Sequence, residues 1–563
     1  MKYLTKYTLL LVIFFASCTD LTEEMHSSVG ANNFLESREN VLQTLSTTYA
    51  YSHTTSLISW LFPQELTADL LLTPTRGVHG YNAGEYLRLT RHTWTNLDRG
   101  GAMAWDANYS VIGFANAFIE DIEPLDYSNF GMSDEEKSQH LAEARVLRAF
   151  AYWKLLDIYG GVPIATSITE DPKPRNSSEE VFRFIETELN ETLSQLPVKT
   201  SNGNAETVNR ITQGANRFLL MRLYFNSEAY IDQPMYSETM ALAQSLINGE
   251  FGDYDLDSSW NGPFRADNLN SPENVFAYPI EMGQRDEKGW WFGGFHHYES
   301  HLTFGSSHGG AGWNGWGLAP SITAEGDLLE YDLGMPYSRF DERDVRKRNW
   351  NYIGNGDWEG MFLAGPQMTY DGSAPVLGVE EYAGQPLVLV DYVARMSEGK
   401  TESHSMLEGE ENTGIRPVKV TPPYPDEAAQ YQAQADQPEM RMAEVYFTLA
   451  ECQLRAGDKG SAAQTINQVI QRNYEDADWN DASLGLQVTA ADLDDEGYRM
   501  LEEWAKEFLM EPRRRIDLIR WDKYTTGTWF DHNEPSEDHR KRMPIPYDAL
   551  NANPLLEQNP GYN

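Results

Sequence analysis

Cysteine is scarce in this sequence, since only Cys18 and Cys452 occur among its 563 residues. A chain of this length can bury a large apolar core, so it does not need a disulfide framework in order to fold. If Cys18 is chemically modified, as argued below, no intramolecular disulfide can form. Cys452 falls within an apolar helical pattern, and we expect it to lie in the core.

Positive charge is also in short supply. Lysine and arginine total 44 against 85 aspartates and glutamates, which gives a formal net charge of -41 at pH 7. A charge of this sign repels phosphate-rich partners, so we exclude nucleic acid as a ligand. The same repulsion disfavours strongly anionic polysaccharides unless a local basic pocket overcomes it. The composition therefore favours a neutral ligand.

Long apolar runs are missing after the start of the chain. No later segment has about 18 uninterrupted apolar residues, the length that a membrane-spanning helix needs. At the start, Lys2 and Lys6 precede the apolar run 8–16, which is too short to span a bilayer and is typical of a cleaved targeting segment. We therefore predict a signal peptide over residues 1–17.

The targeting segment ends in Phe15-Ala16-Ser17-Cys18. Small residues directly before a cysteine resemble the lipobox, at which bacterial lipoprotein signal peptidase cleaves after diacylation of the thiol. We predict that Cys18 carries the lipid and that residues 18–30 form a polar, acidic tether, so that lipid alone anchors the protein. The alternative is an ordinary secretory peptide with an incidental cysteine.

Apolar residues recur at helical spacing in several separate parts of the chain. The clearest run is 134–159, which Gly160-Gly161 ends. A second unit pairs a helix starting at Met440 with another over about 461–472, in the manner of a tetratricopeptide hairpin. Four helix pairs are predicted in this way, at 134–159, 210–248, 440–472 and 498–521. The fold is therefore predicted to be mostly α, a tetratricopeptide-like helical scaffold.

The middle of the chain has a different character. Over residues 250–435 the helical periodicity disappears and Gly, Pro, Trp, Asn and Asp cluster, which predicts mainly loops. Short strand-like runs occur at 275–278 and 386–390. The sequence thus indicates a helical scaffold, mainly 31–250 and 436–530, that carries a large loop-rich region with short strands. Loops held on a rigid scaffold are where ligands usually bind.

Aromatic residues gather in one part of this loop-rich region. Residues 289–317 contain four of the chain's 15 tryptophans and nine glycines. So many glycines disfavour regular structure, so we expect a loop that exposes aromatic rings. Such rings stack on the C–H faces of sugars, while polar groups at the rim bind the hydroxyls. Trp313 and Trp316 are the preferred stacking residues, followed by Trp290 and Trp291. The alternative is that about half of the aromatic side chains here only pin the loop to the scaffold.

Several strings together resemble the SusD/RagB family of outer-membrane nutrient-binding lipoproteins. The longest is Ala-Glu-Ala-Arg-Val-Leu-Arg-Ala-Phe-Ala-Tyr-Trp-Lys-Leu at 142–155, followed by Tyr-Gly-Gly-Val-Pro at 159–163. The others lie at 65–69, 105–116, 272–276, 416–419, 441–446, 517–521, 544–546 and 558–562. The resemblance covers essentially the whole mature chain. Pro512 departs from the family's glycine and is expected to shorten the last scaffold helix.

The resemblance implies a lipid-anchored protein on the outer face of the outer membrane. It implies one SusD-like body over 31–563, with a loop-built glycan site, that closes as a lid over a SusC-like TonB-dependent transporter. The loop 74–82 often contributes to that site in the family, which makes Arg76, Tyr81 and Asn82 candidate ligand contacts. His296 is a further candidate, as a hydrogen-bond donor at the rim of the aromatic loop.

Metal chemistry is not supported by the sequence. Four histidines lie close together, His296, His297, His301 and His308. They lack a carboxylate or cysteine at a recognised zinc spacing, and no segment has the spacing of a calcium loop. We expect no metal site and no cofactor.

Catalysis is the main alternative to binding. A surface glycoside hydrolase needs two carboxylates at a defined separation, and among 85 acids some pair always looks suitable. No nucleophile elbow, metalloprotease helix or phosphate loop occurs. We therefore expect a protein that captures oligosaccharides or polysaccharides and is not an enzyme. The alternatives are a surface glycoside hydrolase, or the same fold binding peptides.

Overall fold

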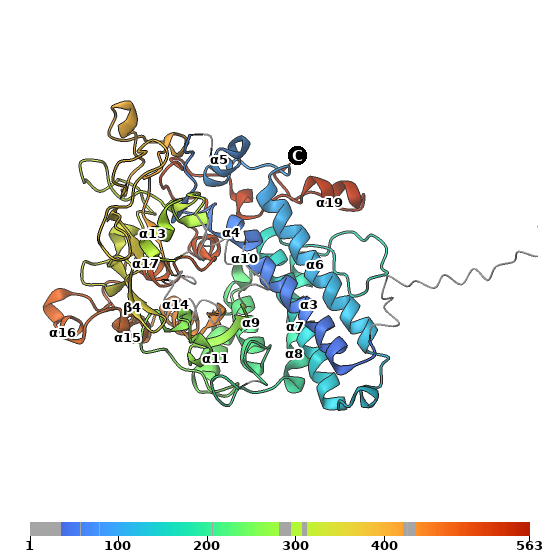
Figure 1. The fold of residues 1–563 in the computed structure, drawn as a ribbon. Coiled ribbons are helices and arrows are strands. Elements are labelled where there is room, and N and C mark those ends of the chain that lie inside the picture. The colour runs from blue at the N-terminus through green and yellow to red at the C-terminus, as the bar shows by residue number, and fades with distance from the viewer. Residues whose placement is uncertain are drawn as a thin grey trace, which may run out of the picture.

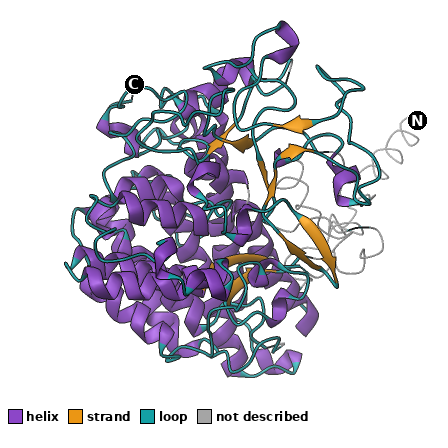
Figure 2. Ribbon diagram, turned by 90° about the vertical axis from the view of Figure 1, so that its left-hand side faces the viewer, coloured by secondary structure: helices purple, strands orange, loops and turns teal. Residues whose placement is uncertain are grey.

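The helices gather in one part of the structure, and most of the loops with short strands lie to one side of them (Figures 1 and 2). The computed structural model describes residues 35–56, 58–77, 79–204, 206–280, 294–306, 312–419, 425 and 435–562. The prediction of a mostly α, tetratricopeptide-like scaffold is confirmed. The predicted signal peptide, Cys18 and the tether 18–30 lie outside the described residues.

The longer helices are α3 (Arg38–Ser56), α4 (Ile58–Glu65), α6 (Arg99–Ile122), α7 (Asp134–Tyr159), α8 (Ser178–Thr192), α9 (Gln213–Phe225), α11 (Tyr236–Ile247), α14 (Met442–Arg455), α15 (Lys459–Ile470) and α17 (Tyr498–Glu507). The shorter ones are α5 (Glu85–Thr90), α10 (Ser227–Ile231), α13 (Ser300–Phe304), α16 (Asp476–Trp479), α18 (Arg514–Arg520) and α19 (Tyr547–Ala552). The strands pair two by two, all antiparallel: β1 (Leu71–Leu72) with β3 (Gly317–Leu318), β2 (Asn274–Tyr278) with β10 (Gln437–Arg441), β4 (Asn351–Gly354) with β5 (Asp357–Glu359), β6 (Phe362–Leu363) with β9 (Arg416–Pro417), and β7 (Gly365–Pro366) with β8 (Val388–Leu389).

Helix α7 is at the centre of the helical half, where it packs against α6, α8 and α3 (Figure 1). Its bounds are those predicted from the periodicity. Ser133 and Glu136 form a capping box at its start, which satisfies two of the backbone N–H groups that a helix leaves unpaired. Gly160 ends it with φ 75°, a backbone conformation that favours glycine.

The second half of α7 is buried on all sides, charged residues included. Buried charges are usually paired, although Lys154 donates instead to the hydroxyl of Ser56. Arg148 contacts Glu188 at 2.6 Å, and Asp157 contacts Arg515 at 2.7 Å. The motif of residues 142–155 that carries the family resemblance is thus the inner helix of the scaffold, held to its neighbours by ion pairs.

The predicted helix pair at 134–159 is instead the single helix α7, which runs without a turn. The other three predicted pairs are found close to their expected positions. They are α9 with α11, α14 with α15, and α17 with α18. Pro512 lies between α17 and α18, as expected from its effect on helices. Cys452 is fully buried in α14, which confirms its predicted place in the core. Among the described helices, none combines the length and apolar character needed to cross a membrane.

One helix start is corrected by the structure. The prediction that a helix begins at Met440 is wrong, because Met440 and Arg441 belong to β10 and α14 begins at Met442. In β10, Met440 lies opposite Phe276 of β2. The strand-like run 275–278 is confirmed as part of β2, whereas only Val388–Leu389 of the run 386–390 forms a strand.

Glu65, at the end of α4, links two distant parts of the scaffold. Its carboxylate oxygen Oε1 accepts hydrogen bonds from the backbone N–H groups of Arg513 at 2.8 Å and Arg514 at 2.9 Å. The other oxygen has no hydrogen-bond partner among the described residues. Burial raises the pKa of Glu65 to about 8 and outweighs these hydrogen bonds. The side chain therefore stays protonated at neutral pH.

The Glu65→Gln substitution should make stability less dependent on pH. Because the folded-state pKa of Glu65 is raised, its contribution is fully present below the unfolded-state value and is lost as pH rises through the folded-state value. Relative to the wild type, the variant should gain about 1.4 kcal/mol of unfolding free energy per pH unit between pH 4.5 and about 8. Urea unfolding from pH 5 to 9 measures this, with the exposed Glu206→Gln as control. Identical pH slopes in all three proteins would contradict it.

Candidate binding surface

A buried arginine joins three segments of the loop-rich half. The guanidinium of Arg76 donates hydrogen bonds to four backbone carbonyl oxygens, those of Asn314, Gly315, Glu410 and Thr413. These bonds hold the loop 74–82 against segments 312–316 and 410–413. Burial lowers the pKa of Arg76 to about 10, a value at which it is still charged at neutral pH. The prediction that Arg76 contacts ligand hydroxyls is wrong, because its guanidinium is enclosed by carbonyl groups of its own chain.

A second buried arginine reinforces the same junction. Arg416 donates to the carbonyl oxygens of Glu411, Thr413 and Gly414 and to the side-chain oxygen of Asn314. Asn314 in turn donates from its side chain to the carbonyl oxygen of Glu411 at 2.8 Å. Segments about 100 residues apart in the sequence are thus fixed side by side.

The carboxylate of Glu411 shapes the neighbouring loop. It accepts hydrogen bonds from the backbone N–H groups of Val379, Glu380 and Tyr382, at 2.9, 3.2 and 2.7 Å, and lies 3.0 Å from His297 Nε2. Burial alone would raise the pKa of Glu411, but His297 and these N–H groups lower it to about 2. An anion held by several N–H groups fixes their orientation. Residues 379–382 are therefore held in one conformation.

Two of the predicted stacking and rim residues are exposed on this framework. Trp313 is 48% exposed and Tyr81 is 52% exposed. Asn82, next to Tyr81, is exposed as well. All three stand on the segments that Arg76 holds together. A single exposed aromatic ring is not unusual, but two of them on segments that are held together make this surface a candidate for ligand binding.

Other predicted ligand contacts are buried. Trp316 is only 4% exposed and packs edge-on against Phe62 and Phe295, so the prediction that it stacks on a sugar is wrong. His296 is 3% exposed and lies against Phe304. Burial lowers the pKa of His296 to about 3, so this ring is neutral, and because it is buried its role as a rim donor is not supported. Trp290 and Trp291 lie outside the described residues.

Four side chains that the sequence did not single out complete the surface. His79 Nε2 lies 3.5 Å from a carboxylate oxygen of Glu380, and its ring centre is 6.4 Å from that of Tyr298. Glu381 accepts a hydrogen bond from the backbone N–H of Glu411 at 3.1 Å. Burial, together with the adjacent Glu381, raises the pKa of Glu380. In the sequence, the two glutamates appear only as an acidic pair in a loop between two glycines, which is a weak signal.

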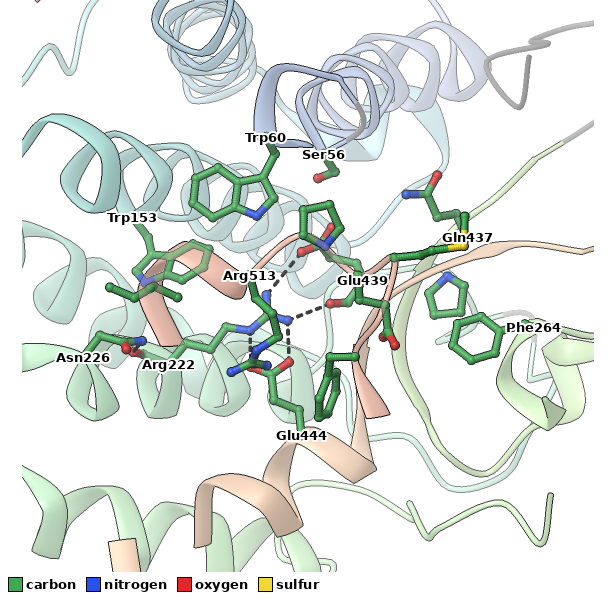
Figure 3. A pocket seen from close by; sticks show the side chains of 16 residues that line it. Ser56, Trp60, Trp153, Arg222, Asn226, Phe264, Gln437, Glu439, Glu444 and Arg513 are labelled. Carbon is green, nitrogen blue, oxygen red and sulfur yellow. Dashed lines mark hydrogen bonds and ion pairs between the residues drawn. The ribbon is translucent and has the colours of Figure 1, made fainter. Parts of the chain in front are cut away.

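The pocket in Figure 3 lies in the helical half and has a structural explanation. Trp60 and Trp153 form one wall, and Arg222 and Arg513 point to the carboxylate of Glu444. Arg222 and Arg513 contact that carboxylate at 2.7 and 3.1 Å. The cavity of about 60 Å³ has room for about two water molecules at roughly 30 Å³ each. It is too small for a saccharide unit.

Two larger clefts are lined by ion pairs that hold the scaffold together. The first, of about 550 Å³, includes Arg520, which contacts Glu451 at 2.9 Å. The second, of about 420 Å³, includes Lys506, which contacts Glu503 at 2.7 Å. At its rim, the ring of Tyr498 has the ammonium of Lys523 4.3 Å from its centre. The exposed loops around Trp313 and Tyr81 remain the better candidate, because both rings are about half exposed.

Among the described residues, no group of three or more His, Cys, Asp or Glu side chains could hold a metal ion. His297 Nε2 lies 3.0 Å from a carboxylate oxygen of Glu411.

Comparison with known proteins shows which families this chain resembles. The model of the SusD family matches residues 272–562, and a model described as "Starch-binding associating with outer membrane" matches residues 76–225. The "Starch-binding protein SusD" of Bacteroides thetaiotaomicron is 26% identical over 482 residues, which cover 79% of this chain and 76% of that protein.

Solved structures share the fold. The "Surface glycan-binding protein A" of Bacteroides uniformis has a TM-score of 0.64 at 18% identity, over 92% of this chain and 99% of that one. B. fragilis NanU has a TM-score of 0.66 at 18% identity, over 96% of this chain and 99% of that one. Because the first family model spans more than half of the sequence, the chain belongs to the SusD family.

Proposed function

We propose that this protein captures oligosaccharides or polysaccharides at the cell surface, without cleaving them. The observation that carries the proposal is the pair of half-exposed aromatic rings, Trp313 and Tyr81, on loops that Arg76 and Arg416 hold in place. Rings fixed in advance can stack on sugars with little further loss of conformational entropy. The exposed Asn82 supplies amide groups that suit sugar hydroxyls.

The relatives support the same ligand class and location. Two of the similar proteins are named for binding starch or surface glycans, and one matching family model is described by association with the outer membrane. We propose that the signal peptide 1–17 is removed, that Cys18 carries a lipid, and that the protein is held on the outer face of the outer membrane. Its partner is then a SusC-like TonB-dependent transporter, to which it delivers the captured glycan.

The proposal is tested by asking whether the protein binds a polysaccharide without cleaving it. The purified mature protein should be slowed in native gels that contain a bound polysaccharide, and the polysaccharide should release no new reducing ends over a day. Release of reducing ends that Glu380→Gln abolishes would instead favour a glycoside hydrolase. Unchanged migration across a broad panel of polysaccharides would contradict glycan binding.

A further inference from the structure

We infer that the acidic pair Glu380 and Glu381 makes this surface select glycans without negative charge. The inference rests on the proposed function and narrows its ligand class. Neutral sugars and amino sugars are accepted, whereas chains that carry uronic acids or sulfate groups are rejected.

Neither of the two arginines that join the loops carrying the exposed rings is available to a ligand, and Arg88, which lies beside Tyr81 and is 33% exposed, is paired with Asp98. Arg76 and Arg416 are 1% and 0% exposed. Their guanidinium groups donate to backbone carbonyl oxygens and to Asn314. A sugar carboxylate or sulfate usually requires an arginine that can offer it two parallel N–H groups. Here both guanidinium groups hold the loops together instead.

Two carboxylates reach the surface beside these loops. The Glu380 side chain is 28% exposed, and Glu381 is partly exposed beside it. Their backbone is fixed, because the N–H of Glu380 is bound by the carboxylate of Glu411 at 3.2 Å. Glu381 is itself held through the N–H of Glu411 at 3.1 Å. The carboxylate of Glu380 lies against His79 and that of Glu381 accepts the N–H of Glu411, so both are held at this surface.

This acidic pair adjoins the exposed rings. Glu380 pairs with His79, which belongs to the loop that carries Tyr81. The backbone of His79 is hydrogen-bonded to Arg76, whose guanidinium binds the carbonyl of Asn314, next to Trp313. An anionic sugar resting on these rings thus meets two fixed negative charges. In partly screened solvent, such repulsion weakens binding on the order of tenfold. A carboxylate also accepts hydrogen bonds from hydroxyl and ammonium groups, so neutral and amino sugars gain contacts.

A glycan array tests the inference with the purified mature protein. The array carries neutral, free-amine, uronate-bearing and sulfated oligosaccharides, including neutral chains matched to their C6-carboxylated forms. We expect the bound members to be neutral or amino-bearing, and each carboxylated form to bind at least tenfold more weakly than its match. The difference should shrink in 1 M NaCl, because the Debye length falls from about 8 to about 3 Å.

Variants assign the effect to the acidic pair. Glu380→Gln with Glu381→Gln keeps the hydrogen-bond acceptors and should bring each matched pair within about threefold. The control, Glu342→Gln with Glu537→Gln, removes the same charge at side chains that are 85% and 80% exposed elsewhere, and should keep the wild-type ratio. Equal or tighter binding of carboxylated chains by the wild type would overturn the inference while leaving glycan binding intact. Binding of no array member would contradict the proposed function, and the inference with it.

Discussion

Replacing Arg441 by leucine should lower the free energy of unfolding by about 3–5 kcal/mol, the usual cost of removing one partner from a buried ion-pair network. Arg441 is 1% exposed. Its guanidinium contacts the carboxylates of Glu273 and Glu507 at 2.8 Å and that of Glu511 at 2.6 Å. Leucine fills part of the volume but leaves these carboxylates with fewer cations in a dry environment.

The network joins segments that are distant in the sequence. Glu273 stands directly before β2, Arg441 ends β10, and Glu507 ends α17. Burial would raise the pKa of Glu507, but Arg472, Arg441 and other nearby cations lower it, so the carboxylate is ionised at neutral pH. Loss of Arg441 therefore weakens the connection between the loop-rich half and the scaffold helices.

Urea unfolding at pH 7 measures the effect. Arg348→Leu is the matched control, because Arg348 is 47% exposed and pairs with Glu475 at the surface; it should cost less than about 1 kcal/mol. Equal stability of the two variants would show that the buried network is not what stabilises this junction.

Trp313→Ala should weaken glycan binding by about 1–3 kcal/mol, or roughly 5- to 150-fold, if stacking provides the main contact. The ring is 48% exposed, so its removal takes little apolar area out of the core. The melting temperature should therefore stay close to that of the wild type. Calorimetry with a glycan chosen from the array measures the affinity, and differential scanning calorimetry measures the stability.

Tyr547→Ala is the control for that experiment. Tyr547 is 50% exposed at the start of α19, in a part of the chain away from the loops that Arg76 joins. Its removal should leave the affinity unchanged. An affinity that is unchanged in Trp313→Ala as well would place the glycan elsewhere.

The helical half was largely predictable from the sequence, because its signals are local. Apolar spacing located α7, and the pattern around Cys452 placed α14 within two residues of its start. Met440 was misassigned because its spacing fits a helix equally well. Met440 belongs to a strand because it pairs with β2, which lies more than 150 residues earlier in the sequence.

The candidate surface was only partly predictable, because exposure depends on packing between distant segments. Trp313 and Trp316 are three residues apart in the same glycine-rich context, yet Phe62 and Phe295 cover only the second. Arg76 looked suited to hydroxyl binding, but the carbonyl groups that enclose it come from segments more than 230 residues away. The role of Glu380 and Glu381 could not be predicted, because it depends on Glu411, which fixes their loop only in the folded structure.

Fluorine NMR of the protein labelled with 5-fluorotryptophan tests most directly whether a sugar meets the open ring. The Trp313 signal can be assigned from its absence in Trp313→Phe. On addition of a bound glycan this signal should shift, while that of the buried Trp316 stays in place. A glycan that binds and leaves the Trp313 signal unmoved would contradict the account.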